Sequence, residues 1–436
     1  MNFRRILGHG AMSLFLVSGA WLASFSVETP PAHAIAAIQG ERAMPAYWLD
    51  RVRDADRLLM KPEQVARMNQ IVRHQGSTLL DLAHYPAAIQ ASELRKQMSL
   101  AMKSYSGWEL PRIFKDGRQL SWEDWKAVKD NCGYDVPRGE LPVGYAVTVR
   151  RADLRRLPVA DAWTAVTDPT RDEMQAMLLD PAEPVVVLWR SVDGIFSFVQ
   201  TRNYLGWVET SALGFADREQ WLRYAAPPQY MMVVVDQRTW IVNGKELKFR
   251  MSAHIPALEG IGSSWRVILP TAENGRLVDQ EMVLNADQTL HAGPLPCRKG
   301  NIIRQAFRLL GAPYSYGCKN GGWDAPSFVS AVYRSVGIDL PQDVAEQEHV
   351  MLNRLPLEGM NSSQRYVAFF NAEPMSLLFS PKHVMLYLGM DGGGEPIVIH
   401  AMDGKQPQVM LSDLHFAAGE YNDEMLSLLT SIGSIF

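Results

Sequence analysis

The first hundred residues space their apolar side chains with the period of a helix. Between residues 47 and 102, apolar positions recur at intervals of three and four. They are Val65, Met68, Ile71 and Val72 in one run, and Leu94, Met98 and Ala101 in another. Pro62 stands where it would open the earlier helix in its first turn. The pattern predicts an N-terminal helical stabilising domain over residues 40–140, without a catalytic grouping.

After residue 140 the pattern changes to short runs with strand character, separated by polar, turn-rich pieces. The runs are residues 145–149, 184–189 and 203–209, and then 231–236, 239–242, 247–251 and 265–269. Asn243-Gly244 between two of these runs predicts a β-hairpin. We interpret the two sets as two small β-barrels, the first over residues 141–218 and the second over residues 219–296.

The last part of the chain, residues 297–436, contains both helix-type and strand-type hydrophobic patterns. Asn301 is predicted to cap a helix that Gly311 ends, and a glycine-rich loop over residues 317–322 precedes a second helix. Two apolar runs at residues 383–390 and 396–401 then predict strands. Helices followed by an antiparallel sheet indicate α+β architecture. The whole chain is therefore expected to be a multidomain α+β protein.

The N-terminus has the three parts of a secretory signal. Arg4 and Arg5 precede an apolar run over residues 11–25, and Ala32-His33-Ala34 forms a small-residue cleavage site. This run is shorter than the roughly 20 residues that a bilayer span needs. We expect a signal peptide over residues 1–34 and a protein exported to the periplasm or the cell exterior. An uncleaved membrane anchor is the alternative.

Composition and charge exclude some classes of protein. Of the 436 residues 47% are hydrophobic, which is enough for packed cores and excludes general disorder. The net charge of −4 gives no basic footprint for nucleic acid. The three cysteines, Cys132, Cys297 and Cys318, are too few and too scattered for a disulfide framework or a zinc site. No metal and no cofactor are expected.

Several stretches of the last part resemble the NlpC-type cell-wall cysteine peptidases, which have a papain-like fold. The matching stretches are residues 301–311, 313–317, 321–324, 327–329, 340–343, 382–384 and 399–401. Upstream, residues 149–154 and 205–208 are similar to the multidomain branch of that family. That branch has an N-terminal stabilising domain and two bacterial SH3-type domains. The resemblance implies a cell-wall association.

The resemblance also implies roles for individual residues. In such a site, a cysteine at a helix N-terminus is the nucleophile and a histidine on a facing strand is the base. His383 and His400 match the family's base and orienting residue. Tyr314 matches the residue whose hydroxyl helps to stabilise the oxyanion, and Asp343 matches a carboxylate that meets the substrate's amine. Asp324, which precedes the nucleophile position, is grouped with Tyr314 and Asp343 as substrate-binding.

The nucleophile itself departs from the family pattern. Relatives read Asp-Cys-Ser at the helix start, whereas this chain reads Asp324-Ala325-Pro326. The methyl group of Ala325 cannot attack a carbonyl. Residues 374–377 read Pro-Met-Ser-Leu where relatives carry Pro-Gly-Asp-Leu, and Gln342 stands where many relatives have arginine. Several departures around one cleft indicate a natural loss of catalysis.

We therefore expect a degenerate peptidase domain that binds peptidoglycan stem peptides without efficient cleavage. Resemblance implies that active relatives cleave between γ-D-glutamyl and a diamino acid. One alternative is an active endopeptidase with a non-standard nucleophile such as Cys318. Others are a metal held by the two histidines and Asp324, an inert cleft, and a scaffold for another cell-wall protein.

The tryptophans raise the question of a carbohydrate-binding surface. Five of them fall in the barrel region: Trp163, Trp189, Trp207, Trp240 and Trp265. Small barrels need large side chains to fill their interiors, so core packing is the favoured interpretation for each.

Overall fold

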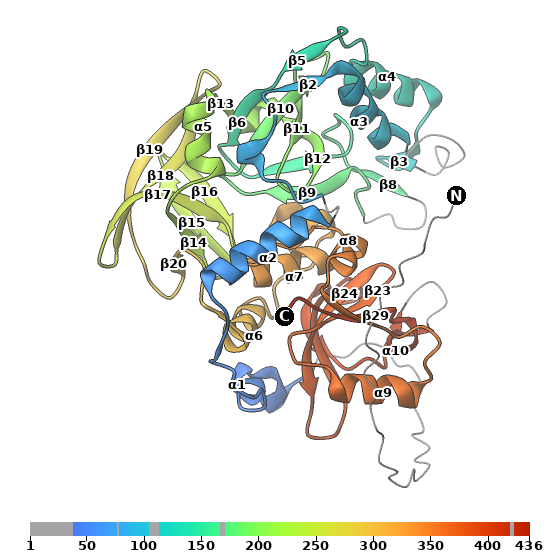
Figure 1. The fold of residues 1–436 in the computed structure, drawn as a ribbon. Helices are drawn as coiled ribbons and strands as arrows, with labels where there is room; N and C mark the ends of the chain where they lie inside the picture. Colours follow the sequence, from blue (N-terminus) through green and yellow to red (C-terminus); the bar gives the residue numbers. More distant parts are fainter. Residues whose placement is uncertain (1–37, 76–77, 104–112, 166–170, 419–422) are drawn as a thin grey trace, which may run out of the picture.

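The computed structural model describes most of the chain beyond the predicted signal peptide (Figure 1). The described residues are 38–75, 78–103, 113–165, 171–418 and 423–436. A mixed N-terminal segment leads into a strand-rich middle and then into a C-terminal unit of helices around one sheet. This confirms the predicted multidomain α+β class. In the described part of the chain, the helices are too short or too polar to cross a membrane.

The N-terminal segment contains the predicted helices together with short strands. Its elements are η1 (Gly40–Ala43), α1 (Pro45–Leu49), β1 (Leu58–Met60), α2 (Pro62–His74), η2 (Leu82–His84), β2 (Ala88–Gln90), α3 (Ala91–Lys103), β3 (Ile113–Lys115), β4 (Arg118–Gln119) and α4 (Trp122–Cys132). Pro62 lies in the first turn of α2, as predicted, because its nitrogen has no intrahelical partner there. Val65 and Met68 are buried, whereas Ile71, in the same helix, is exposed.

The buried side chains of this segment are divided between two cores. Val72 of α2 packs with Ile303 and Val336 of the C-terminal unit, and Figure 1 shows α2 lying across the helices of that unit. Leu94 of α3 and Trp125 of α4 pack instead into the core of the strand-rich middle. The described part of the segment therefore joins its neighbours together, which differs from the single helical unit expected from the pattern.

The middle of the chain is built almost entirely of strands. They are β5 (Glu140–Pro142), β6 (Gly144–Thr148), β7 (Ala152–Arg155), β8 (Trp163–Ala165), β9 (Gln175–Leu179), β10 (Pro184–Arg190), β11 (Phe196–Gln200), β12 (Leu205–Glu209), β13 (Leu213–Ala216), β14 (Tyr230–Val233), β15 (Gln237–Val242), β16 (Lys245–Arg250), β17 (His254–Ile261), β18 (Ser264–Glu273), β19 (Arg276–Asn285), β20 (Leu290–Ala292) and β21 (Cys297–Arg298), with η4 (Thr210–Ala212) and α5 (Arg218–Ala225) between them. Most of these strands form one sheet, ordered β20-β14-β17-β18-β19-β13-β6-β10-β11-β12-β7-β9. Within this sheet, a parallel pairing of Phe215 with Arg276 joins the strands of residues 141–218 to those of residues 219–296. These two sets of strands are called the first and second barrel below, after the prediction.

The hairpin and the tryptophan packing predicted for this region are both present in the structure. β15 and β16 form the hairpin predicted from Asn243-Gly244, with Val242 paired to Lys245. Both turn residues have positive φ, as the tight two-residue turn requires. Trp163, Trp207 and Trp240 are buried in the core, and Trp189 and Trp265 pack against it. Core packing of these tryptophans is therefore confirmed.

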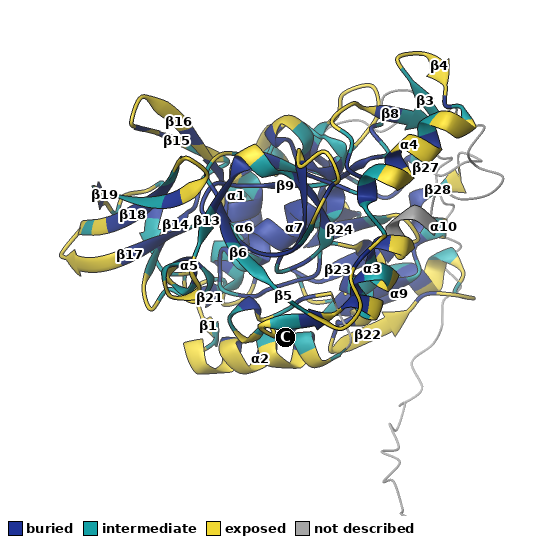
Figure 2. Cartoon of the chain, turned by 90° about the horizontal axis from the view of Figure 1, so that it is seen from above, coloured by how far each residue is buried: buried dark blue, intermediate teal, exposed yellow. Residues whose placement is uncertain are grey.

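The C-terminal unit places helices against an antiparallel sheet. Its elements are α6 (Lys299–Arg308), η5 (Tyr316–Gly321), α7 (Ala325–Arg334), α8 (Val344–His349), β22 (Asn353–Pro356), α9 (Ser362–Asn371), β23 (Leu377–Ser380), β24 (His383–Met390), β25 (Pro396–Met402), β26 (Gln408–Ser412), β27 (Ala417–Ala418), β28 (Asp423–Glu424), α10 (Met425–Leu428) and β29 (Ser431–Ser434). The sheet runs β22-β29-β23-β24-β25-β26. Figure 2 shows buried residues concentrated around α6, α7 and β24.

The start of α6 differs from the prediction. The helix begins at Lys299, with Arg298 as its N-cap, so Asn301 lies inside the first turn. The Asn301 side-chain amide donates to the carbonyl of Pro296 at 2.8 Å instead of capping the helix. Cys297 and Arg298 pair as a strand with β1, and this pairing holds the chain in position for an earlier helix start.

The loop η5 connects the C-terminal unit to the first barrel. Lys319 forms an ion pair with Asp172 at 2.6 Å, and Asp172 in turn binds Arg155 at 2.5 Å. The Gln175 side chain donates to the carbonyl of Gly317 at 3.2 Å. These contacts fix the glycine-rich loop that leads into α7.

His415 is buried in a polar cluster of the C-terminal unit that also contains Tyr366, Glu395 and Glu424. Its Nδ1 hydrogen-bonds to Glu424, and its Nε2 lies 3.2 Å from a carboxylate oxygen of Glu395. The Tyr366 hydroxyl lies 2.7 Å from the same Nε2 and 2.8 Å from Glu395. The cluster therefore ties α9 to the segment between β26 and β28.

This cluster predicts a pH dependence of stability. Burial disfavours the imidazolium of His415, but the hydrogen bond and charge of Glu424, followed by the charge of Glu395, outweigh burial and raise its pKa above 6.5. The stabilisation is fully present below the unfolded pKa of about 6.5 and is lost as the pH rises through the higher folded pKa. We expect the free energy of unfolding to fall as the pH rises above 6.5, measured by urea denaturation.

His415→Gln removes the titrating group and serves as the comparison. Its free energy of unfolding should be lower than that of the parent near pH 6 and should vary less above pH 6.5. An equal pH slope in parent and variant would show that His415 does not carry the effect.

Candidate active site

Position 325 lies at the start of a well-capped helix. Ala325 is the first residue of α7, and 4% of its surface is exposed. The Asp324 carboxylate caps the helix by accepting the N–H of Ser327 at 3.0 Å, and it also accepts the N–H of Gly317 at 2.9 Å. Pro326 fits the first turn, where its nitrogen needs no partner. The helix start is thus preserved, with a methyl group at its first position.

The two predicted histidines are in direct contact. Nε2 of His383, on β24, lies 2.7 Å from Nδ1 of His400, on β25. Nε2 of His400 lies 3.0 Å from the hydroxyl of Ser412, on β26. α7 packs against β24 and β25. The structure therefore brings the helix that begins at Ala325 against the strands that carry the histidine pair.

Both imidazoles are neutral near pH 7. Burial lowers the pKa of His383 to about 4. Burial, with repulsion from His383, also lowers the pKa of His400 well below 6.5. In a cysteine peptidase, a neighbouring thiolate would stabilise the imidazolium. Ala325 supplies no such anion, so the two imidazoles are in contact as neutral groups, without the charge of an ion pair.

The three residues predicted to bind substrate lie in two places. Tyr314 is half-buried, and burial raises its pKa, with the carboxylates of Asp324 and Asp403 adding to the rise. The charge of Asp324 thus reaches the Tyr314 hydroxyl. Asp343 is exposed at the N-cap of α8, where its carboxylate accepts the N–H of Ala345 at 2.9 Å.

The first barrel adds side chains that the sequence did not indicate. The pKa of Tyr204 is raised to about 12, chiefly because its hydroxyl is buried. The Arg156 guanidinium opposes this rise and the Asp343 carboxylate adds to it. Arg156 and Arg171 both donate to the Tyr316 hydroxyl, at 2.9 and 2.7 Å. Tyr204 lies in a run that the pattern identified as a strand. Its position near Asp343 depends on how the barrel docks, for which no local signal exists.

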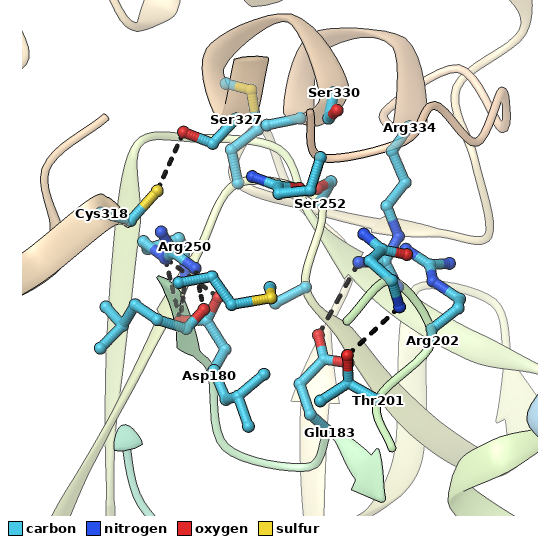
Figure 3. A pocket seen from close by; sticks show the side chains of 18 of the residues that line it. Asp180, Glu183, Thr201, Arg202, Arg250, Ser252, Cys318, Ser327, Ser330 and Arg334 are labelled. Atoms are coloured by element: carbon cyan, nitrogen blue, oxygen red, sulfur yellow. Dashed lines mark hydrogen bonds and ion pairs between the residues drawn. The ribbon is translucent and has the colours of Figure 1, made fainter. Parts of the chain in front are cut away.

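Cys318 has a different environment from a reactive thiol. It is 1% exposed, and its thiol lies 2.9 Å from the Ser327 hydroxyl. Burial raises its pKa to about 11, with the Asp324 carboxylate adding to the rise and Arg250 opposing it. Figure 3 shows Cys318 beside Arg250 at the edge of a cavity beneath α7. The thiol is therefore protonated at neutral pH, which argues against its being a replacement nucleophile.

A metal site at the histidine pair is not supported. Throughout the part of the chain that the structure describes, no group of His, Cys, Asp and Glu side chains is arranged to hold a metal ion. Nε2 of His383 and Nδ1 of His400 are engaged with each other, so neither nitrogen is directed at a shared ion with Asp324.

Met375 occupies a backbone conformation that favours glycine. Its φ is 75°, and its side chain is buried in the core of the C-terminal unit. Its carbonyl accepts a hydrogen bond from the Tyr333 hydroxyl of α7. This is the position at which the sequence departs from the Pro-Gly-Asp-Leu pattern, so a methionine here adopts a conformation that suits glycine.

Substitution of Met375 separates backbone strain from packing. Met375→Ala removes the buried side chain and should destabilise the protein by about 2–4 kcal/mol. Met375→Gly loses the same side chain but relieves the positive-φ strain. It should therefore be more stable than Met375→Ala by about 1 kcal/mol, measured by urea unfolding. The reverse order would show that the position carries no such strain.

The environment of Cys318 predicts low reactivity. At pH 7.5 the native protein should resist iodoacetamide for a time in which the urea-unfolded chain is alkylated at all three cysteines, because each is buried in the fold. Mass spectrometry of the labelled peptides measures this. Rapid native labelling that disappears in Cys318→Ala would contradict the inert environment.

Parts of the chain are similar to known proteins. Residues 311–418 match the NlpC/P60 family, and residues 160–209 match the SH3 domain of SH3b1 type. The gamma-D-glutamyl-L-lysine dipeptidyl-peptidase of Bacillus cereus (strain ATCC 10987 / NRS 248) is 24% identical over 279 residues, which are 61% of this chain and 77% of that protein. Dipeptidyl-peptidase 6 of Lysinibacillus sphaericus is 26% identical over 137 residues, 31% of this chain and 44% of that protein. The chain thus spans less than half the length of the second relative.

A solved structure shares the overall fold. It is an NlpC/P60 endopeptidase from Photobacterium damselae subsp. piscicida, with a TM-score of 0.70 and 15% identity over 93% of this chain and 97% of that one. The likeness at this identity concerns the fold. Together with the matched regions, it shows that the chain carries an NlpC/P60 family domain of papain-like fold behind an SH3 domain of the bacterial type.

Proposed function

We propose that this chain is an exported cell-wall protein whose NlpC/P60 domain binds peptidoglycan stem peptides without cleaving them efficiently. The observation that carries the proposal is Ala325 at the capped start of α7, against strands whose histidine pair is intact. A methyl group cannot attack an amide. In a triad hydrolase that has lost its nucleophile, the reaction is only about 10³–10⁴ times faster than in water, because binding and the oxyanion hole alone remain.

Export is part of the proposal and rests on the N-terminal sequence. The signal over residues 1–34 lies outside the described residues, so its support is the basic start, the apolar run and the Ala-x-Ala end. Assembled peptidoglycan lies outside the cytoplasmic membrane, so export would bring the protein to its proposed ligand.

The polar groups near the start of α7 suit a stem peptide. We propose that the exposed Asp343 carboxylate pairs with the free amine of the peptide, near the Tyr204 hydroxyl of the first barrel. Arg156 and Arg171, which converge on Tyr316, provide positive charge for the peptide's carboxylates. Tyr314 and Asp324 lie at the helix start, where the scissile amide of a relative's substrate would be held.

The names of the relatives suggest which bond such a peptide contains. One relative is named as acting on the γ-D-glutamyl-L-lysine linkage. We propose that the ligand here is a stem peptide with a γ-D-glutamyl bond to a diamino acid, such as L-Ala-γ-D-Glu-diaminopimelate. The histidine pair and Tyr314 would then contact the peptide without a covalent step.

Restoring the thiol tests this proposal. Ala325→Cys should place a thiol at the N-terminus of α7, where the helix dipole favours the thiolate. Incubated with L-Ala-γ-D-Glu-diaminopimelate, this variant should turn over at least about 10²-fold faster than the parent, since nucleophile loss costs about 10⁶ in a triad hydrolase. Chromatography of the released dipeptide measures the rate.

Two further variants complete the test. Ala325→Cys combined with Pro326→Ser restores the neighbouring hydroxyl and should be at least as active as the single variant. Cys318→Ala serves as the matched control and should behave like the parent. Turnover by the parent that vanishes in Cys318→Ala would overturn the proposal and favour an active endopeptidase.

A further inference from the structure

A cavity of about 70 Å³ lies where the two barrels and the C-terminal unit meet. The first barrel contributes Arg202 and Glu183, the second contributes residues 250–253, and α7 contributes its face from Ser327 to Arg334. Figure 3 shows Arg250, Asp180 and Cys318 at one end of the cavity and Arg202, Glu183 and Arg334 at the other. Arginines outnumber carboxylates at both ends, but the two ends differ in the hydrogen bonds that their arginines make.

At the Cys318 end, Arg250 makes several hydrogen bonds, although its Nη1 is buried without an acceptor among the described residues. Nε of Arg250 lies 3.1 Å from a carboxylate oxygen of Asp180, and its Nη2 donates to the carbonyl of Leu178 at 2.8 Å. Arg151 lies on the same carboxylate at 3.4 Å. A carboxylate and a carbonyl thus hold this end together.

At the other end, three guanidinium groups face two carboxylates. Arg73 and Arg202 both bind Asp339, at 3.3 and 3.0 Å. Arg334 is left with Glu183 alone, at 3.7 Å. Three positive charges against two negative charges leave one positive charge in a largely buried place.

Arg334 is the group left without hydrogen bonds. Its guanidinium makes no hydrogen bond within the described residues, and its Nε is buried without an acceptor among them. A guanidinium has five N–H donors, and burial without acceptors is costly. Burial lowers the pKa of Arg334, and the neighbouring Arg202 lowers it further.

The other titratable groups that face Arg334 supply no negative charge near pH 7. Burial lowers the pKa of His254 well below 6.5, with Arg334 and Arg202 adding to the fall, so its imidazole is neutral. Burial raises the pKa of Tyr230, which stacks on His254, so the phenol stays protonated. The excess charge at this end is therefore not balanced from within the described residues.

We propose that the Arg202–Arg334 end of this cavity is a binding site for one small oxyanion, a phosphate or a small carboxylate. The fork of an arginine matches two oxygens of such an anion. At roughly 10–15 Å³ for each water-sized group, the cavity has room for a few such groups, which suits phosphate or acetate and excludes a bulky anion. The bound anion would join the first barrel to α7.

Thermal unfolding in different sodium salts tests this proposal. Phosphate and acetate are each compared with gluconate, which is too bulky for the cavity, at equal ionic strength and pH. We expect a saturable rise in Tm with phosphate, acetate or both, on the order of 5 °C at a 100-fold excess over Kd. The responding salt identifies the anion as phosphate or carboxylate, and no rise over gluconate with either would overturn the proposal.

Substitution of Arg334 locates the site. Arg334→Met removes the excess charge, so its Tm in gluconate should match or exceed that of the parent, and its response to the anion should be lost. Arg266→Met on the exposed part of β18, where Arg266 pairs with Glu259 and Glu281, should respond like the parent. An Arg334→Met variant that keeps the full response would contradict the assignment.

A conservative variant keeps the test decisive if Arg334→Met does not fold. Arg334→Lys retains the charge but loses the fork geometry, so the anion concentration at half-response should rise at least about tenfold. An unchanged half-response concentration would overturn the role of Arg334.

Discussion

The carboxylate of Asp324 accepts the backbone N–H groups of Ser327 and Gly317, and through them it fixes both the first turn of α7 and the loop η5. Burial raises the pKa of the Asp324 carboxyl, and the hydrogen bonds from Ser327 and Gly317 act in the opposite direction. These hydrogen bonds therefore stabilise the charged cap in its buried position. From the other side, the first barrel holds η5 through Lys319 and Asp172. The position of Ala325 follows from this arrangement and not from any chemistry of its own side chain.

The geometry at the start of α7 therefore needs no thiol at position 325. Pro326 needs no partner for its nitrogen in the first turn, and Ala325 packs with the core of the C-terminal unit. The pair of His383 and His400 is held by strand pairing and by Ser412, with no contribution from a thiol. The fold around position 325 therefore depends on the cap, the strand pairing and the core packing, and the side chain at position 325 contributes only its methyl group.

Local patterns predicted what depends on local structure. The strand from His383 to Met390, the hairpin at Asn243-Gly244 and the first turn of α2 at Pro62 all follow from neighbouring residues. The helix start at Lys299 was missed, because strand pairing of Cys297 and Arg298 with β1 sets it. Contacts between units could not be predicted from the sequence. The packing of α2 in one core and of α3 and α4 in another arises only when the units dock. The same holds for the position of Arg334 opposite Glu183.

The central claim is that the cleft binds a stem peptide without cutting it. Isothermal titration of the parent protein with L-Ala-γ-D-Glu-diaminopimelate, followed by mass spectrometry of the recovered peptide, tests it most directly. We expect saturable heat and an intact peptide, with the heat reduced in Asp343→Asn, because the amine would lose its carboxylate partner. Absence of heat, together with absence of any peptide-induced rise in Tm, would contradict the claim and favour an inert cleft or a scaffold for another cell-wall protein.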